Sequence, residues 1–439
     1  MRLLYNFGIC FYAVALRVVA PFNSKARLMV RGRRRIFRRL AEAVGGVARP
    51  GDAGVGGATP SGDGIAETVW RSAAGAGSKI IWFHAASLGE FEQGRPVIEQ
   101  VRAQYPDYKI LLTFFSPSGY EIRKDYAGAD WIFYLPLDTP RAARRFVDTV
   151  RPQIAVFIKY EFWLNLLRAL ERSGCRTYLI SAIFRPGSVF FRWYGGVYRR
   201  ALATYDTIFV QKGDSAALLA SIGVTSAVEA GDTRFDRVAA IAEAAADVAV
   251  VEKFRGDSRL LVAGSTWPRD EELLVQLLDR FPDIKMVIVP HETDPARIER
   301  LVASLPVPSV RYTQATPGSD LTKVRAMVVD TIGLLSSIYR YAWVAYIGGG
   351  FGAGIHNTLE AATYGIPIAF GPNFERFREA RQMVEQGCAV SVATSGELEM
   401  WIGSFYYDRE AYGRLCRIAA GYVASNRGAT EAIMRGIFG

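Results

Sequence analysis

Short hydrophobic runs alternate with helix-like spacing along most of the chain. From position 79 onward, runs of about five or six apolar, often β-branched residues are followed by longer stretches of helical periodicity. This alternation predicts strand–helix units on parallel sheets. The first series of predicted strands is Ile80–Ala85, Ile110–Phe115, Trp131–Leu135, Ile154–Ile158, Thr177–Ala182 and Thr207–Gln211. The second series is Leu260–Ala263, Met286–Pro290, Met327–Asp330, Val344–Gly348 and Ile366–Phe370.

Two such series predict an α/β protein with two doubly wound domains that face each other across a cleft. At 439 residues the chain is too long for one ordinary core. We expect an N-terminal arm over 1–45, a first domain over 46–230 and a second over 231–439. Arg49–Ser78, rich in Gly, Ala, Pro and Ser, is expected to be a loop or short hairpin, and Ser395–Phe438 to be largely helical.

The charge of the chain is concentrated at its start. Residues 1–40 hold ten Lys and Arg and no acid, which leaves 43 basic and 43 acidic residues in the remainder. The apolar run Leu3–Leu16 precedes most of these charges. A helix of this length is about 21 Å long, short of the roughly 30 Å hydrocarbon core. We therefore expect an anchor on the cytoplasmic surface of a membrane, although a core helix with a solvated basic face stays an alternative.

Several other classes of protein fit the sequence poorly. The positive charges follow the apolar run, unlike those of a cleaved signal peptide, and the balanced remainder offers no extended basic surface for nucleic acid. Four widely spaced cysteines and three histidines form no metal-binding motif, and the cysteines indicate a reducing compartment.

The stretch Ala345–Pro372 is rich in glycine at a predicted strand-to-helix turn. Five glycines fall between Gly348 and Gly354, and a helix is expected to open at about His356. Glycines let backbone N–H groups approach an anion closely, and a helix N-terminus favours negative charge. The turn therefore suits a nucleotide phosphate, but tight corners without a ligand have the same composition.

Two glutamates follow predicted strands of the first domain. Glu90, in H-A-A-S-L-G-E, lies where a strand ends and a helix begins, and a carboxylate there can serve as a general base. Ser87 and Glu90 also have the spacing of a helix capping box. Glu161, in K-Y-E-F-W-L-N, can be a second cleft acid or simply a helix-opening residue.

Small or polar turns follow four predicted strands of the second domain. Ser265 and Thr266 are expected to cap a helix and can contact a phosphate. His291 is either a loop residue or a nucleotide contact, and Gly333 permits close backbone approach at a helix start. Asn357 and Glu360 have the spacing of a cap with a reciprocal acid, or can bind the hydroxyls of a ribose.

The order of these motifs resembles that of the 3-deoxy-D-manno-octulosonic acid (Kdo) transferases, over roughly residues 1–435 apart from Arg49–Ser78. The resemblance is carried by H-A-A-S-L-G-E, Y-L-P-L-D, Y-E-F-W-L-N, G-D-T-R-F-D, A-G-S-T, V-P-H, V-D-T-I-G-L, G-G-G-F and H-N-T-L-E-A-A-x-x-G-I-P-I-A-F-G-P. It implies a GT-B fold of two Rossmann-like domains. It further implies an inverting, metal-independent transfer, without a cofactor, from CMP-Kdo to the 6′-hydroxyl of lipid IVA at the cytoplasmic face of the inner membrane.

The same resemblance implies roles for individual residues. Glu90 matches the family's catalytic base and Glu161 a second acid of the cleft. The implied donor contacts are Arg234, Ser265, Thr266, Pro290, His291, Ile332, Gly333, Leu334, Asn357, Thr358, Leu359 and Glu360. Two departures stand out. Arg234 replaces a usual lysine, which changes the donor fork. The chain has Pro290-His291-Glu292-Thr293 where the family often has P-R-H-P, so an arginine is lost there.

Two other functions remain open on the sequence. One is another GT-B enzyme, such as a lipid-linked hexosaminyl transferase or a UDP-sugar epimerase. The other is a catalytically inactive protein that binds a membrane surface. Donor choice separates the first from a Kdo transferase, and the effect of Glu90→Ala on turnover separates the second.

Overall fold

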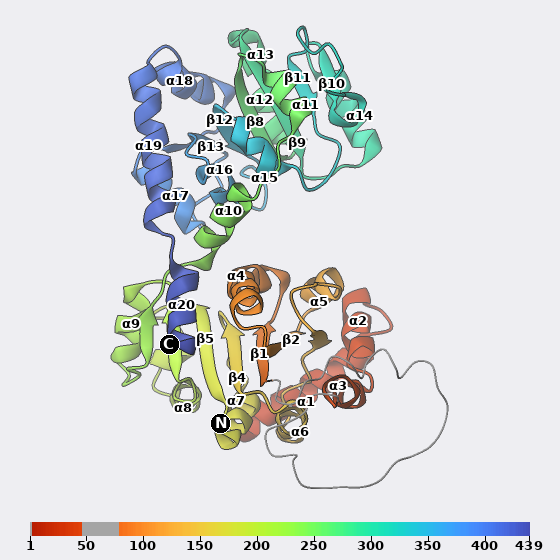
Figure 1. Ribbon diagram of the computed structural model, residues 1–439, viewed down its shortest axis with the longest axis vertical. Coiled ribbons are helices and arrows are strands. Elements are labelled where there is room, and N and C mark those ends of the chain that lie inside the picture. Colours follow the sequence, from red (N-terminus) through yellow and green to blue (C-terminus); the bar gives the residue numbers. More distant parts are fainter. Residues whose placement is uncertain (1, 46–78) are drawn as a thin grey trace. The chain divides into compact units, whose positions relative to one another are not determined.

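The computed structural model describes residues 2–45 and 79–439 and divides them into two compact units (Figure 1). The first unit is Met1–Thr233 together with Gly428–Gly439, and the second is Arg234–Arg427. The expected division near 230 thus lies close to a unit boundary, but the last helix of the chain returns to the first unit, which the sequence did not reveal. The loop expected over Arg49–Ser78 lies outside the described residues.

The first unit is built on a seven-stranded parallel sheet in the order β3-β2-β1-β4-β5-β6-β7. Its central strands are buried on both faces, as helices covering both sides of a parallel sheet require. In β1, Trp82 packs into the core on one face and Phe83 into the core on the other. The strands are β1 (Lys79–Ala85), β2 (Tyr108–Phe114), β3 (Trp131–Tyr134), β4 (Ile154–Ile158), β5 (Arg176–Ala182), β6 (Thr207–Val210) and β7 (Ala227–Glu229).

Ten α-helices and one 3₁₀ turn accompany this sheet among the described residues. They are α1 (Arg2–Val19), α2 (Ser24–Gly32), α3 (Ile36–Val44), α4 (Leu88–Gln104), α5 (Pro117–Arg123), α6 (Pro140–Val150), α7 (Leu164–Ser173), η1 (Val189–Phe191), α8 (Gly196–Leu202), α9 (Gly213–Ala220) and α20 (Ala429–Phe438). The return of α20 is fixed by burial, because Ile433, Met434 and Ile437 pack into the core beside β1 and β2.

The N-terminal arm is helical and is packed against the first unit along one side. α3 buries Ile36, Leu40 and Val44 in the core, while α1 keeps an exposed apolar stripe. α1 is 18 residues long and, by length and composition alone, could cross a membrane. A buried core helix and a signal sequence pass the same test, but no residue of α1 is buried. The alternative interpretation, that the apolar run is a core helix, therefore does not describe α1. Of these two helices, α3 is the one with residues in the core.

The second unit repeats the design with a seven-stranded parallel sheet in the order β10-β11-β9-β8-β12-β13-β14. Its strands are β8 (Arg259–Thr266), β9 (Ile284–Pro290), β10 (Ser309–Arg311), β11 (Ala326–Val328), β12 (Val344–Ile347), β13 (Ile368–Phe370) and β14 (Ala389–Ser391). Its helices are α10 (Thr233–Glu243), α11 (Ala249–Arg255), α12 (Pro268–Val275), α13 (Leu277–Arg280), α14 (Pro295–Ser304), η2 (Tyr312–Gln314), α15 (Leu335–Ile338), η3 (Tyr339–Tyr341), α16 (Leu359–Ala362), α17 (Arg378–Glu385), α18 (Ser395–Tyr406) and α19 (Arg409–Ser425).

All eleven predicted strands are present, with ends shifted by a few residues. The expected α/β class with two doubly wound sheets is confirmed. In the middle of each sheet the strand order changes direction, between β1 and β4 in the first unit and between β8 and β12 in the second. Ligands of such sheets bind at the carboxyl ends of the strands beside this switch point. The switch points therefore locate one candidate site in each unit.

Candidate active site

The two predicted acids of the first unit flank its switch point. Glu90 follows β1 and Glu161 follows β4, the two strands that are hydrogen-bonded to each other there. Their side chains are close enough for the charge of Glu161 to raise the pKa of Glu90. Two carboxylates that are 71 positions apart in the chain are thus neighbours at the edge where a parallel sheet binds its ligands.

Glu90 closes the expected capping box at the start of α4. Its Oε2 accepts hydrogen bonds from the backbone N–H of Ser87, at 2.8 Å, and from the Ser87 hydroxyl, at 3.0 Å. These bonds lower the pKa of the carboxyl, but burial of the half-buried side chain, followed by the charge of Glu161, raises it more. The pKa of Glu90 is therefore above its ordinary value, which suits a general base better than a fully solvated carboxylate.

Glu161 is buried, and its carboxylate is held from two sides. Oε2 lies 3.1 Å from Nε2 of His84 and accepts a short hydrogen bond from the Trp163 indole. His84, at the end of β1, is fully buried and reaches Thr113 Oγ1 at 2.9 Å through Nδ1. The expectation that Glu161 opens a helix is wrong, because α7 begins at Leu164. The structure instead makes Glu161 a buried neighbour of Glu90 that a histidine positions.

At the switch point of the second unit, the residues Ser265 and Thr266 belong to β8 itself. They do not cap a helix, as the sequence suggested; Trp267 is the N-cap of α12. Ser265 has a φ of 55°, and the following residue realigns with β9 after a break in register. The buried Thr266 hydroxyl donates to Glu271 at 2.8 Å, and Glu271 pairs with Arg297 at 2.8 Å. This bulge turns the end of β8 toward the loop after β12.

The glycine-rich loop after β12 packs backbone against backbone. A Cβ at Gly348 would lie 2.2 Å from the carbonyl oxygen of Ser265, and one at Gly350 would lie 2.5 Å from Gly371. The buried Asp270 accepts from the N–H of Gly349 at 2.9 Å and so holds the loop to α12. At these positions glycine is required by close packing, while Gly352 has only one distant neighbour, at 3.8 Å.

The loop does not lead into a helix at His356, as the sequence predicted. The N–H of His356 donates back to the carbonyl of Gly348 at 3.1 Å, which closes the loop. Helix α16 begins only at Leu359 and has a single turn. Thr358 is its N-cap, so Asn357 is not the cap that the spacing suggested. Asn357 lies one residue earlier: its Oδ1 accepts from Leu359 N–H at 3.1 Å, and its Nδ2 donates to Glu360 at 2.9 Å. A ribose contact by Glu360 stays a prediction.

Three aromatic rings form a stack across the same strand ends. His291, after β9, stacks on Trp267 with ring centroids 4.9 Å apart, and on His356 with centroids 4.5 Å apart. Trp267 Nε1 also donates to His356 Nε2 at 3.3 Å. Burial, followed by the neighbouring His291, lowers the pKa of His356, which favours its neutral ring. Of the three, only His291 was predicted as a donor contact, because its two partners lie in other motifs.

The remaining predicted donor residues make no ring contact with this stack in the structure. Ile332 is exposed and Gly333 has a φ of 94°, with open space where a Cβ would be. Leu334 precedes α15, and Pro290 ends β9. The hydroxyl of Thr358 is buried and has no hydrogen-bond partner among the described residues. Arg234 pairs with Glu379 at 2.9 Å, so its guanidinium is already engaged by a carboxylate.

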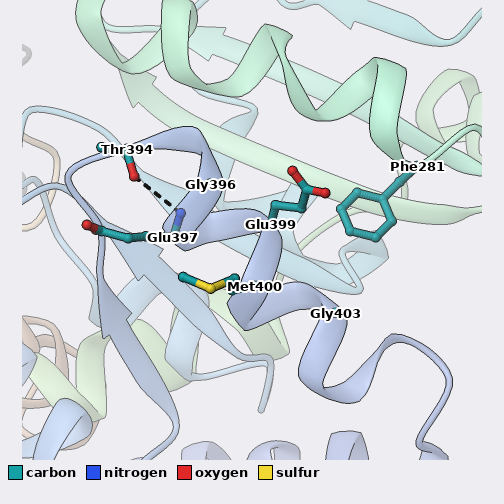
Figure 2. Close-up of a pocket in the computed structure, with 7 residues that line it drawn as sticks. All are labelled: Phe281, Thr394, Gly396, Glu397, Glu399, Met400 and Gly403. Carbon is teal, nitrogen blue, oxygen red and sulfur yellow. Dashed lines mark hydrogen bonds between the residues drawn. The ribbon is translucent and has the colours of Figure 1, made fainter.

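Cavities of the second unit occur on its helices as well as near its strand ends. One of about 600 Å³ lies between α13 and α18 and is lined by Phe281, Thr394, Gly396, Glu397, Glu399, Met400 and Gly403 (Figure 2). Another of about 660 Å³ lies between α12 and α14, where Glu271 and Arg297 contribute to its wall. None of the predicted donor residues lines either cavity. Neither cavity therefore coincides with the predicted donor residues.

The two doubly wound units, each with candidate site residues at its switch point, define a GT-B α/β protein. Solved structures confirm the fold. The UDP-GlcNAc 2-epimerase from Neisseria meningitidis aligns with a TM-score of 0.56 at 13% identity, over 82% of this chain and 99% of that one. A putative UDP-N-acetylglucosamine 2-epimerase from Listeria monocytogenes gives 0.56 at 13% identity, over 82% of this chain and 95% of that one. At such identity the likeness concerns the fold alone.

Sequence comparisons show which family the chain is similar to. Residues 63–237 match the family model described as 3-deoxy-D-manno-octulosonic-acid transferase (kdotransferase). The 3-deoxy-D-manno-octulosonic acid transferase of Bordetella pertussis is 25% identical over 369 residues, covering 80% of this chain and 85% of that protein. The enzyme of that name from Haemophilus influenzae is 24% identical, covering 81% of this chain and 85% of that protein.

The resemblance drawn from the motifs is thereby confirmed: residues 63–237 match the Kdo transferase family model, and the relatives that carry this name align with most of the chain. The expectation that the chain is an enzyme of this class is confirmed by the same matches. One detail was wrong: the family match begins at residue 63, inside the stretch Arg49–Ser78 that the motifs left unmatched.

Proposed function

We propose that this protein transfers Kdo from CMP-Kdo to the 6′-hydroxyl of lipid IVA, the lipid A precursor, with inversion and without a divalent metal. The observation that carries the proposal is the half-buried Glu90 carboxylate at the switch point, inside the segment that matches the Kdo transferase family. A sheet of this kind presents its ligand at that place, and a base with a raised pKa is what deprotonation of a sugar hydroxyl requires.

Glu90 acts as the general base in this proposal. The acceptor oxygen forms a bond with the anomeric carbon of Kdo as the bond from that carbon to the CMP phosphate oxygen breaks. The hydroxyl proton passes to Glu90. Ser87 holds Oε2 through two hydrogen bonds, so Oε1, which accepts none from the described residues, is the atom left for the acceptor. Glu161 does not take the proton; together with burial, its charge keeps the pKa of Glu90 raised.

The second unit binds the donor in this proposal. The stack of Trp267, His291 and His356 offers ring faces to a cytosine, and stacking of a base on an aromatic ring contributes about 1–3 kcal/mol. In this proposal the backbone at Gly333, which has open space where a Cβ would be, and the hydroxyl of Thr358, which has no partner among the described residues, contact the CMP hydroxyls and phosphate. Arg234 would contribute charge only by sharing its guanidinium with Glu379.

The acceptor is lipid-linked, so the enzyme must work at a membrane. The exposed apolar stripe of α1 and the basic residues that follow it support the cytoplasmic leaflet of the inner membrane as that place. An apolar helix face next to a polybasic segment binds anionic leaflets by burial and by charge together.

Mass analysis of the product tests the proposal. Purified protein is incubated with CMP-Kdo and tetraacylated lipid A precursor, with and without EDTA, and a parallel reaction receives UDP-GlcNAc as the donor. We expect Kdo to be added in both CMP-Kdo reactions and no turnover of UDP-GlcNAc. Turnover of UDP-GlcNAc alone would establish the rival GT-B activity, and loss of activity with EDTA would refute the metal-free step.

Substitutions separate the roles of the two units. Glu90→Gln should abolish transfer and leave CMP-Kdo binding intact, whereas Trp267→Ala should weaken CMP binding about tenfold, which is 1.4 kcal/mol. Trp193→Ala, at an exposed indole of the first unit, is the control and should change neither quantity. Transfer that survives Glu90→Gln would remove Glu90 from the mechanism.

A further inference from the structure

A basic cavity lies in the first unit, and neither Glu90 nor Glu161 lines it. It has a volume of about 240 Å³ and is lined by residues of α6, α7 and the start of α1. Four arginines line it, Arg2, Arg144, Arg168 and Arg172, against one acid, Asp148. Neither the proposed transfer nor the donor requires a binding site on this helical face of the sheet.

The arginines gather in the cavity because of helical spacing. Arg168 and Arg172 are four residues apart on α7, so they project from one face, and Arg144 has the same relation to Asp148 on α6. Across the residues that the structure describes, none of the four arginines has an ion pair or a side-chain hydrogen bond. A cavity with several unneutralised guanidinium groups favours an anion, and phosphate is the anion that their planar geometry suits best.

The cavity is joined to α1 by a buried polar contact. Asn165, which lines the cavity, donates through Nδ2 to Asn6 of α1 at 2.8 Å. Tyr5 of α1 donates to the buried Asp138 at 2.6 Å, and Asp138 in turn accepts from the first N–H groups of α7. The start of α1 is thereby fixed beside the arginines.

The opposite side of α1 is apolar and exposed. Leu3, Leu4, Phe7, Phe11, Val14 and Val18 follow helical spacing and are each more than half exposed. If this stripe lies among acyl chains, Arg2 at its start and the cavity beside it lie at the level of the lipid headgroups. The positive charge of the cavity favours an anion, and the position of the apolar stripe favours a lipid.

We propose that the cavity between α6, α7 and the start of α1 binds the phosphate headgroup of an anionic phospholipid. The ligand is a resident membrane lipid, bound in addition to the donor and the acceptor. Its phosphate is held by Arg144, Arg168 and Arg172, and its acyl chains lie in the same membrane leaflet as the apolar stripe of α1. Asp148 opposes the binding, because it adds a negative charge to the same wall.

Binding of a water-soluble lipid monomer tests the proposal without a membrane surface. The full chain is titrated calorimetrically with dihexanoyl phosphatidylglycerol below its critical micelle concentration. Dihexanoyl phosphatidylcholine and inorganic phosphate are titrated separately. We expect saturable binding of phosphatidylglycerol, no binding of phosphatidylcholine, and at least tenfold weaker binding of inorganic phosphate. Phosphate that binds as tightly as the lipid would make this a free-anion site and overturn the proposal.

Matched variants locate the site. Arg168→Gln/Arg172→Gln should weaken phosphatidylglycerol binding at least tenfold, and Asp148→Asn should strengthen it. The control pair is Arg141→Gln/Arg200→Gln, which removes the same charge from exposed positions on α6 and α8 that do not line the cavity. It should leave the affinity unchanged. Equal losses in the two double variants, with both folded by circular dichroism, would refute the cavity as the binding site.

Discussion

The buried pair of His84 and Glu161 is the polar contact on which the first unit should depend most. Their side chains are 0% and 5% exposed, and the 3.1 Å contact joins the ends of β1 and β4. His84→Leu leaves the Glu161 carboxylate buried without this partner. Breaking a buried pair from one side costs about 3–5 kcal/mol, because the desolvation of the remaining group is no longer offset.

The size of this loss can be measured by native-state hydrogen exchange. At 1.4 kcal/mol per factor of ten, the protection of slowly exchanging amides in β1 and β4 should fall by about two to almost four orders of magnitude. Amides of β8 and β9 in the second unit are the internal reference and should not change. Arg38→Leu, at an exposed ion pair, is the control variant and should leave β1 as protected as in the parent chain.

A double-mutant cycle makes the reasoning refutable. Glu161→Leu also removes the acceptor of the Trp163 indole, but that loss is present in both the single and the double variant and cancels. We expect His84→Leu/Glu161→Leu to cost about 2–3 kcal/mol less than the sum of the single variants. A His84→Leu cost below about 1 kcal/mol, or simple additivity, would show that the pair is not an energetic unit.

Two further predictions concern the pH dependence and the glycine loop. Glu161→Gln removes a charge that raises the pKa of Glu90, so the acid limb of kcat/KM should move to lower pH; Ser87→Ala removes a bond that lowers it and should move the limb to higher pH. Shifts of the same sign would contradict this assignment. Gly348→Ala brings a methyl group against a backbone carbonyl 2.2 Å away and should cost at least about 1–3 kcal/mol in the second unit and weaken CMP-Kdo binding. Gly352→Ala, beside open space, should do neither, as thermal unfolding and donor titration can check.

Strands could be predicted from the sequence wherever they are buried on both faces. Central strands of a parallel sheet are continuous apolar runs, and β4 was predicted with its observed bounds. The three strands that were missed, β7, β10 and β14, are edge strands of three residues each. Such strands have few buried side chains, and their pairing depends on a neighbour elsewhere in the chain.

Local contacts of the site were also visible in the sequence, and distant ones were not. The capping box of Ser87 and Glu90 spans three residues and was predicted from its spacing. The partner of Glu161 is 77 positions away, inside the apolar run of β1, where His84 gives no signal of its own. The same holds for Trp267 and His356, which meet over 89 positions. The helix expected at His356 failed for a related reason, because a backbone bond to Gly348 closes the loop first.

The capping role of Glu90 and its proposed catalytic role are compatible. A carboxylate in the first turn of a helix is held ionised by the helix dipole, which by itself makes a weak base. Here burial and the charge of Glu161 act in the opposite direction, and their effect on the pKa of Glu90 exceeds that of the two bonds from Ser87. The cap therefore fixes one carboxylate oxygen in place, while the surroundings keep the other basic. A base that is oriented by its own helix loses little entropy when an acceptor hydroxyl arrives, so the structural role contributes to the chemical one.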